Sequence, residues 1–276
     1  MTNGVIEHVG VIGLGKMGGE LARHLANGGF QAHGYDVRVE AIAAVRAHHV
    51  PPSHSPAHLA SACDLVIIGV GFDSELEAVL FGDQGVMTAP KSGSVIAVAS
   101  TVAPATMLKI AARIEGSGIG IVDIPMARGE QAAIDGNLLI FGGGEANTFE
   151  SCKPAFATFS DAVHYLGPVG AGQVGKLVNN LVLWACISAN YEGFKLAEAL
   201  GVAPAPLREA LLQSSAHNWA LKTDSVNRPM PWAEKDMSIV LKEADAARVA
   251  LPLSGTVKEV VKGVKIEAGQ PMPEER

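Results

Sequence analysis

The sequence is short of cysteine, of basic residues and of long apolar runs, and each shortage excludes a class of protein. Its three cysteines, Cys63, Cys152 and Cys186, lie far apart and form no CxxC pair. We therefore expect buried thiols in a reducing cytoplasm, not a disulfide framework. Lysine and arginine number 21 against 28 acidic residues, so the net charge is -7. Without an excess of cations to neutralise phosphates, no nucleic-acid partner is expected.

No apolar run approaches the roughly 20 residues that a membrane-spanning helix needs. The most apolar stretches are residues 65–72 and 177–187, and no basic segment precedes an apolar run near the N-terminus. We therefore expect no membrane segment and no signal peptide. His54 and His58 stand four residues apart, but in a stretch with Pro and Ser where nothing completes a ligand set. A cytoplasmic protein without a metal site is the expectation.

The first part of the chain alternates short apolar runs with helical patterns. This alternation predicts βαβ units and an α/β domain with a parallel sheet over residues 1–168. The expected strands, buried on both faces, are residues 9–12, 32–35, 65–70, 94–97, 120–122 and 138–141. The expected helices between them are residues 18–26, 39–47, 75–80 and 105–114.

A turn-rich junction at residues 167–170 separates this domain from a second one, residues 169–276, in which strand patterns cease. Residues 173–200 predict one long helix that Gly201 would end. Residues 177–187 are apolar on nearly every side, so we expect neighbours to bury this part all round. Further helices are predicted at residues 205–214, 234–248 and 253–262. The second domain is therefore predicted to be all-α.

The clearest motif is a glycine-rich turn directly after the first strand: Gly13-Leu14-Gly15-Lys16-Met17-Gly18. In Gly-x-Gly-x-x-Gly the first glycine permits a tight turn and the second lets a pyrophosphate approach the backbone. The third allows close packing of helix on strand. The N–H groups and the dipole at the start of the following helix attract phosphate. Strand, turn and helix together predict a dinucleotide-binding Rossmann domain.

Asp36 ends the next strand, 18 residues after Gly18, with Val37 and Arg38 beside it. A carboxylate at this position is placed to hydrogen-bond the adenosine ribose. It also repels a 2′-phosphate, so we expect NAD as the cofactor. Arg38 is placed to reach such a phosphate, which leaves NADP open as the alternative.

Four more motifs follow in order: Ser100-Thr101 with Pro104; Asp123-Ile124-Pro125-Met126-Ala127-Arg128-Gly129; Gly170-x-Gly172-x-x-x-Lys176-x-x-Asn179-Asn180; and Lys235-Asp236. With these motifs the chain resembles, over nearly its whole length, the β-hydroxyacid dehydrogenase family. That family includes 3-hydroxyisobutyrate dehydrogenase and is related to 6-phosphogluconate dehydrogenase. The resemblance implies a Rossmann domain joined by a long helix to an all-helical domain, with the active site in the cleft between them. It also implies an NAD(P)-dependent oxidoreductase acting on the alcohol or aldehyde of a small β-hydroxyacid, and a homodimer or homotetramer.

The resemblance assigns Lys176 the role of catalytic acid and base, and Asn180 that of orienting the substrate. Four residues apart on the long helix, they lie one turn apart on one face. This geometry suits hydride transfer, because negative charge builds on the carbonyl oxygen as hydride arrives and a Lys can donate a proton to it. The other residues that the resemblance places at the substrate are Ser100, Ala127, Arg128 and Gly129. Those that it places at the cofactor, besides the turn and residues 36–38, are Val70, Gly71, Thr101 and Lys235.

One departure from the family bears on the substrate. Most of the family has Ser-Gly-Gly where this chain has Ala127-Arg128-Gly129. The loss of Ser removes a hydroxyl that usually helps to hold the substrate carboxylate. The gained Arg is a planar cation suited to a carboxylate or sulfonate, which favours an anionic substrate. Alternatively, Arg128 faces solvent or a partner subunit.

Two other functions are open on the same scaffold. One is an imine reductase, and such enzymes usually replace the catalytic Lys, so Lys176 argues against it. The other is a cofactor-binding module without turnover, against which the intact pair of Lys176 and Asn180 argues.

Overall fold

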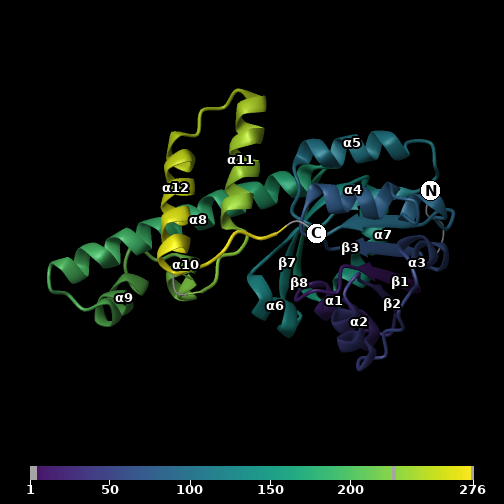
Figure 1. The fold of residues 1–276 in the computed structure, drawn as a ribbon, viewed down its shortest axis with the longest axis horizontal. Coiled ribbons are helices and arrows are strands. Elements are labelled where there is room, and N and C mark those ends of the chain that lie inside the picture. The colour runs from purple at the N-terminus through teal and green to yellow at the C-terminus, as the bar shows by residue number, and fades with distance from the viewer. Residues whose placement is uncertain (1–4, 226–227, 275–276) are drawn as a thin grey trace. The chain divides into compact units, whose positions relative to one another are not determined.

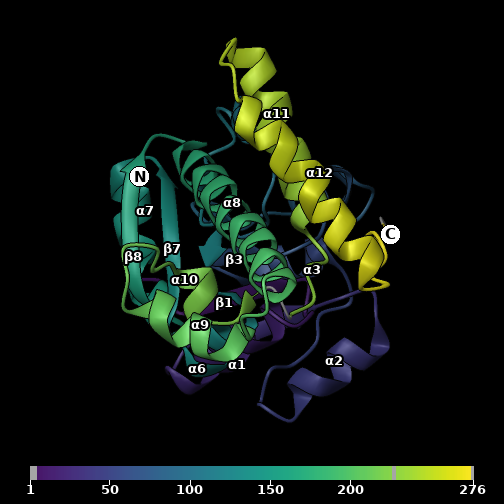
Figure 2. The same ribbon diagram turned by 90° about the vertical axis from the view of Figure 1, so that its left-hand side faces the viewer.

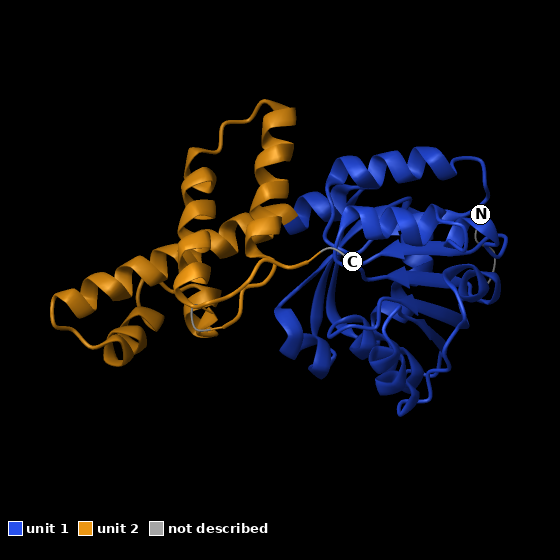
Figure 3. Cartoon of the chain, viewed as in Figure 1, with its two compact units in different colours: residues 1–176, 275–276 blue, residues 177–274 orange. Residues whose placement is uncertain are grey.

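The computed structural model describes residues 5–225 and 228–274, and the chain divides into two compact units (Figure 3). One unit comprises the residues up to Lys176, and the other runs from Leu177 to Glu274. The first is an α/β unit and the second is helical. Within the described ranges, no helix is both long enough and apolar enough to cross a membrane.

The α/β unit is built on an eight-stranded sheet (Figure 1). The strands are β1 His8–Ile12, β2 Gln31–Tyr35, β3 Leu65–Ile68, β4 Val95–Val98, β5 Gly120–Asp123, β6 Met126–Ala127, β7 Leu138–Gly144 and β8 Ser160–Gly167. Their order is β2-β1-β3-β4-β5-β7-β6, with β8 paired to β7. The five strands from β2 to β5 run parallel, as predicted.

The predicted parallel sheet is wrong at one edge. β7 runs antiparallel to β5 and to β6. The reason is that the chain from β5 forms β6 and returns along the same edge, so no crossover connection carries it over a face of the sheet. β8 was not predicted, because its residues are mostly exposed or half-buried and carry little of the apolar signal of a central strand.

Helices cover both faces of the sheet. One apolar core lies between the sheet and α1 Gly18–Asn27, α2 Val39–Arg46, α6 Gly129–Asp135 and α7 Ala146–Phe156. The other lies against α3 Pro56–Ala62, α4 Asp73–Phe81, the 3₁₀ helix Val86–Thr88 and α5 Pro104–Ile114. The predicted helices α1, α2, α4 and α5 are confirmed, while α3, α6 and α7 were not predicted. This doubly covered sheet is the arrangement that presents strand ends to a ligand at one edge.

The helical unit contains most of α8 Ala171–Ala199, with α9 Pro204–Leu212, α10 Trp219–Lys222, α11 Ala233–Ala247 and α12 Pro252–Glu267. α11 and α12 lie side by side and run in opposite directions (Figures 1 and 2). They pack on α8 through an apolar cluster that includes Trp184 and Met237. Gly201, at φ +81°, ends the long helix as predicted.

The expectation that residues 177–187 are buried all round is wrong. Trp184 and Ile187 are buried, but Val178 and Val182 are 57% and 53% exposed. The other helices of this unit pack on the face of α8 that carries Trp184, and no described residue covers the face of Val178 and Val182. An apolar stripe of α8 therefore faces outward in the single chain.

Candidate active site

The glycine-rich turn between β1 and α1 has the geometry that a pyrophosphate requires. Gly13 has φ +89°, and a Cβ there would lie 2.3 Å from the Gly69 carbonyl oxygen. A Cβ at Gly18 would lie 1.9 Å from the Gly13 carbonyl oxygen. At Gly15 the nearest atom would be the Arg38 Nη2 at 3.4 Å, so the backbone there stays open. The turn thus leaves space in front of the N–H groups of α1, and it fits the phosphates of NAD(P).

Asp36, at the end of β2, binds the turn directly. Its Oδ2 accepts a hydrogen bond from the Leu14 N–H at 2.7 Å, and its Oδ1 accepts one from the Arg38 N–H at 2.8 Å. The Arg38 guanidinium lies over the carboxylate with Nε and Nη2 each 3.1 Å from an oxygen. Burial acts to raise the pKa of this carboxyl, but these hydrogen bonds outweigh burial and hold the pKa below its ordinary value. Val37, between the two, is exposed.

Two neighbouring strand ends are joined at Ser100. Its Oγ accepts a hydrogen bond from the Val70 N–H, after β3, at 2.8 Å and donates to the Ile68 carbonyl oxygen at 3.4 Å. The Gly71 N–H donates to Glu75 Oε2 at 2.7 Å. The structure thus brings together Val70, Ser100 and the adjoining Thr101 at the carboxyl edge of the sheet. Ser100 is only 4% exposed, and the substrate contact assigned to it stays a prediction.

Asp123 and Gln173 form a buried network that the sequence interpretation missed. Asp123 ends β5, and its two oxygens accept hydrogen bonds from the N–H groups of Gly170 at 2.7 Å and Gln173 at 2.8 Å. Burial raises the pKa of this carboxyl despite these bonds. The Gln173 side chain bonds the loop after β4, at the Ser100 carbonyl oxygen and the Val102 N–H. The start of α8 is therefore fixed to the carboxyl ends of β4 and β5.

A capping signal would be an acid directly before the helix that it caps, whereas Asp123 lies 47 and 50 residues before its partners Gly170 and Gln173. No local signal marks Gln173 either, because its two partners lie 71 and 73 residues away in the sequence.

Lys176 and Asn180 lie on consecutive turns of α8. Lys176 is half-buried and Asn180 is 2% exposed. The Asn180 Nδ2 donates to Asp236 Oδ2 on α11 at 2.9 Å, and its Oδ1 accepts from Asn179 Nδ2 at 3.0 Å. Asp236 thus anchors the Asn180 amide. Lys235, next to it on α11, places its Nζ 5.5 Å from the centre of the Trp232 ring.

The predicted substrate loop lies beyond the carboxyl edge of the parallel strands. Ala127 ends β6, and Arg128 follows in the left-handed region at φ +83°. The Arg128 guanidinium donates to the Asn137 carbonyl oxygen at 2.7 Å and forms an ion pair with Asp161 on β8. Gly129, also at positive φ, begins α6. Arg128 is therefore held by this unit rather than directed wholly to solvent.

Lys16 links the phosphate-binding turn to this loop. Its Nζ lies 2.9 Å from Glu130 Oε2 at the start of α6, and both side chains are largely exposed. The turn and the loop are thus neighbours within the α/β unit, although an exposed ion pair adds little stability.

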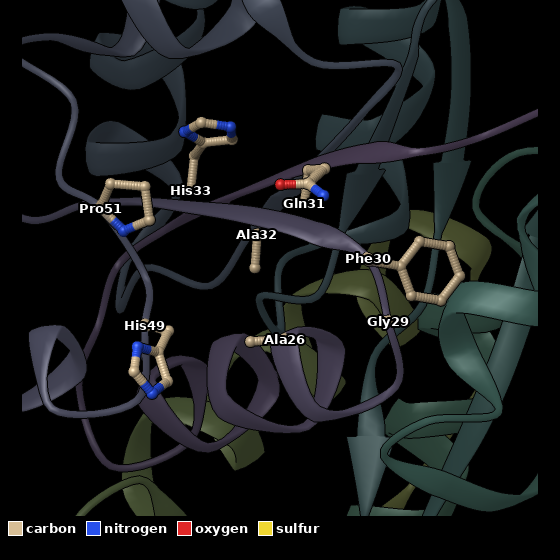
Figure 4. A pocket seen from close by; sticks show the side chains of 8 residues that line it. All are labelled: Ala26, Gly29, Phe30, Gln31, Ala32, His33, His49 and Pro51. Carbon is tan, nitrogen blue, oxygen red and sulfur yellow. The ribbon is translucent and has the colours of Figure 1, made fainter.

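A hollow of about 300 Å³ lies at the opposite end of the same elements (Figure 4). Its lining includes Ala26 near the end of α1 and His33 in the first half of β2. Cofactor phosphates bind at the start of α1 and at strand carboxyl ends, so this hollow is separate from the candidate site.

The described residues place no three His, Cys, Asp or Glu side chains where they could hold a metal ion. Cys63 and Cys152 are buried, as expected, and burial raises the pKa of each thiol to about 12. Cys186 is only partly buried, so the expectation is wrong for this one thiol.

A pyrophosphate turn, an acid at the end of β2 and a Lys–Asn pair on a long helix define an NAD(P)-binding oxidoreductase. Residues 8–167 match the profile described as the NAD-binding domain of 6-phosphogluconate dehydrogenase. Residues 170–272 match the profile described as NAD-binding of NADP-dependent 3-hydroxyisobutyrate dehydrogenase. The chain belongs to this family of NAD(P)-dependent hydroxyacid dehydrogenases, enzymes that act on CH–OH groups.

Among the relatives, 2-(hydroxymethyl)glutarate dehydrogenase of Eubacterium barkeri is 28% identical over 92% of this chain and 88% of its own length. L-threonate dehydrogenase of Cupriavidus necator is 30% identical, covering 92% of this chain and 89% of its own. The crystal structure of 3-hydroxyisobutyrate dehydrogenase from Salmonella typhimurium has TM-score 0.84 at 26% identity, over 95% of each chain. An imine reductase from a Pseudomonas species, at TM-score 0.66 and 18% identity over 96% and 95% of the chains, is more distant.

Proposed function

We propose that this chain oxidises a small β-hydroxyacid that carries an anionic group, or reduces the corresponding semialdehyde, with Lys176 as general acid and base. The observation that carries the proposal is the placement of Lys176 and Asn180 on consecutive turns of α8. The start of that helix is tied to the carboxyl edge of the sheet by Asp123. Residues 1–168 bind the cofactor in this proposal, and residues 169–276 complete the substrate site.

In the oxidation, the Lys176 amine accepts the proton of the substrate hydroxyl as the C–H bond breaks. In the reduction, the Lys176 ammonium returns this proton to the oxygen. The nicotinamide of the bound cofactor supplies the hydride acceptor or donor. Asn180, held by Asp236 and Asn179, orients the substrate without changing its charge. Thr101, Val70, Gly71 and Lys235 contact the cofactor in this proposal.

The proposed cofactor is NAD rather than NADP. Asp36 is negatively charged at neutral pH, and the direction of its pKa shift favours that charge further. A charged carboxylate accepts hydrogen bonds from the ribose hydroxyls and repels a 2′-phosphate. The Arg38 guanidinium neutralises part of that charge, so the preference is expected to be moderate, about tenfold for one unfavourable charge contact.

The proposed substrate class follows from Arg128 and from the relatives. The names of the relatives indicate that they act on 2-(hydroxymethyl)glutarate, L-threonate and 3-hydroxyisobutyrate, each a hydroxyacid with a carboxylate. Arg128 has five N–H donors, of which the Asn137 carbonyl and Asp161 engage only part. The remaining donors can bind a substrate carboxylate while Asp161 holds the guanidinium in place.

The direct test measures reduced nicotinamide with a panel of hydroxyacids, each supplied with NAD and with NADP. The panel should include 3-hydroxyisobutyrate, L-threonate, glycerate, serine and a sulfonate analogue. Lys176→Ala should lower kcat by about 10²–10⁴-fold. Lys195→Ala is the matched control, because Lys195 is an exposed lysine of the same helix that pairs with Glu267. Full activity of Lys176→Ala would overturn the mechanism. Tight cofactor binding without turnover of any panel member would favour a non-catalytic module.

We further propose that the outward apolar stripe of α8 joins two copies of this chain. The exposed residues Val178, Val182, Ala189 and Leu196 recur at spacings of four and seven residues, which puts them along one side of the helix. An apolar stripe of this length is rarely left in water. Light scattering should therefore find a dimer or a tetramer, and Val178→Glu with Val182→Glu should yield monomers. A wild-type monomer would overturn this proposal.

A further inference from the structure

The loop of residues 100–102, which follows β4, is fastened to other elements of the α/β unit by hydrogen bonds at both ends. On one side Ser100 Oγ is bound to the Val70 N–H, after β3. On the other side the loop is bound by Gln173 in the first turn of α8. We infer that Gln173 is a positioning residue that locks the cofactor loop around Thr101 to the same helix as Lys176. This inference rests on the proposed function for the roles of Thr101 and Lys176.

The Gln173 amide makes two hydrogen bonds that straddle Thr101. Its Nε2 donates to the Ser100 carbonyl oxygen at 2.8 Å, and its Oε1 accepts from the Val102 N–H at 3.2 Å. The orientation of the amide is fixed by its partners, since a carbonyl requires a donor and an N–H requires an acceptor. Gln173 is fully buried, so water does not compete for either bond. The peptide groups on both sides of Thr101 are thus pinned.

A side chain of this length must both donate and accept a hydrogen bond here, as a neutral amide does. A Leu side chain offers neither a donor nor an acceptor, and it would leave the Ser100 carbonyl and the Val102 N–H without this partner. A carboxylate accepts but cannot donate, and it would place a charge near the buried Asp123. A protonated carboxyl, by contrast, can donate and accept at once. This difference makes Gln173→Glu an internal test of the two bonds.

The network continues from Gln173 to the sheet and to the catalytic helix. The Gln173 N–H donates to Oδ2 of Asp123, the last residue of β5. Lys176 follows Gln173 by three residues on α8. One residue therefore holds the loop through its side chain and the start of α8 through its backbone. If the bonds to the loop are lost, the loop can shift against Lys176, and a shift of about 1 Å costs on the order of 100-fold in rate.

The first experiment follows hydrogen–deuterium exchange at the Val102 N–H, which requires neither cofactor nor substrate. In Gln173→Leu this amide should exchange about tenfold faster than in the wild type, while the strand amides of β3 and β4 keep their protection. The control Gln213→Leu changes an exposed glutamine of the helical unit and should leave Val102 unchanged. Unchanged exchange at Val102 in Gln173→Leu would overturn the inference.

The second experiment measures the dissociation constant of NADH by titration calorimetry, and then kcat. Gln173→Leu should weaken NADH binding about tenfold and lower kcat by about 10- to 100-fold, with a smaller change in KM for the hydroxyacid. An effect confined to the melting temperature would mean that Gln173 is merely structural and would overturn the inference.

If Gln173→Leu fails to fold, the variant Gln173→Glu tests the inference instead. Two charged groups lie near this position: Asp123 accepts the backbone N–H of residue 173, and Lys176 follows about one turn later on α8. Both are present in the wild type as well. The dissociation constant of NADH for the variant, divided by that for the wild type, therefore reports the effect of the new carboxyl alone. At about pH 5.5 this ratio of dissociation constants should be near one, and it should rise about tenfold by about pH 8, because the carboxyl ionises and can no longer donate. A ratio independent of pH would overturn the inference.

These measurements separate the two proposals. Exchange at Val102 and binding of NADH judge Gln173 even if no hydroxyacid is turned over. Absence of turnover in the wild type would count against the proposed function alone.

Discussion

Two buried carboxylates lie at the carboxyl ends of strands β2 and β5 of the same sheet, and their pKa values shift in opposite directions. Asp36, after β2, faces a guanidinium and two backbone N–H groups, and its pKa is lowered. Asp123, at the end of β5, is fully buried, accepts only backbone N–H groups, and its pKa is raised. At the more deeply buried Asp123, the N–H donors alone do not outweigh the cost of burying a charge, whereas at Asp36 the guanidinium adds to them. Asp36 is suited to meet a ligand as an anion, and Asp123 is suited to hold a helix.

The largest effect is expected from removing the helix anchor. Asp123→Ala leaves the N–H groups of Gly170 and Gln173 buried without this acceptor, at a cost of about 1–3 kcal/mol for each. We therefore expect the free energy of unfolding to fall by about 3–5 kcal/mol, as measured by urea denaturation. A loss below about 1 kcal/mol would show that this end of α8 is held by other contacts.

Removing the other carboxylate should cost less stability but alter the cofactor preference. Asp36→Ala frees the Leu14 N–H and leaves Arg38 without its anion, so we expect a loss of about 1–2 kcal/mol. The ratio of kcat/KM for NAD to that for NADP should fall at least tenfold, because the repulsion of a 2′-phosphate is gone and Arg38 is released. Asp64→Ala is the control, since Asp64 pairs with Lys91 away from the turn. An unchanged ratio would contradict the assigned role of Asp36.

The opposite pKa directions predict opposite slopes of stability with pH. Relative to an ordinary pKa of 3.8, the raised pKa of Asp123 means that its contribution is greatest below about pH 4 and is lost as pH rises through the folded-state pKa. The advantage of the wild type over Asp123→Asn should therefore shrink on going from acid to neutral pH.

For Asp36 the sign is reversed. Its lowered pKa means that its contribution is present above the ordinary pKa and is lost as pH falls through the folded-state pKa. The advantage of the wild type over Asp36→Asn should therefore shrink toward low pH. Urea denaturation of the three proteins between about pH 3 and pH 7 checks both signs. Parallel slopes for the two variants would refute the comparison.

The smallest effect is expected from replacing Arg38, the cation that pairs with Asp36. Arg38 is 41% exposed, so its ion pair with Asp36 is screened by water. Arg38→Met should lower the free energy of unfolding by about 0.5–1 kcal/mol. It should also lower the affinity for NADP more than for NAD, which titration of the two cofactors would measure. Equal losses for both cofactors would mean that Arg38 stays on Asp36 when the cofactor binds.

The sequence predicts the cofactor region around Asp36 but not the network around Asp123, and the reason is physical. The turn at Gly13, Gly15 and Gly18 and the acid at Asp36 lie within one βαβ unit, so spacing alone revealed them. The network of Asp123 and Gln173 joins residues about 50 and 70 positions apart, and no local pattern encodes it. Long apolar periodicity predicted α8 and its end at Gly201, but it could not show which face stays uncovered at Val178.

The same limit applies to the substrate loop. The family resemblance marked Ala127, Arg128 and Gly129, and the positive φ of Arg128 and its pairing with Asp161 became visible only in the structure. The reversal of β7 had no sequence signal either, because a buried strand reads alike in both directions.

That reversal has a consequence for how this protein could be changed. Because the chain leaves the sheet after β6 and returns along β7, α6 with its flanking residues is an excursion at the edge of the sheet. It is held by Arg23 and the ring of His24, which bond its last carbonyl oxygens. A segment that connects two paired strands, here β6 and β7, can be exchanged for one of different length without altering the order of the strands. If this segment holds the substrate as proposed, residues 128–137 are the part of the chain to exchange in order to change the substrate range.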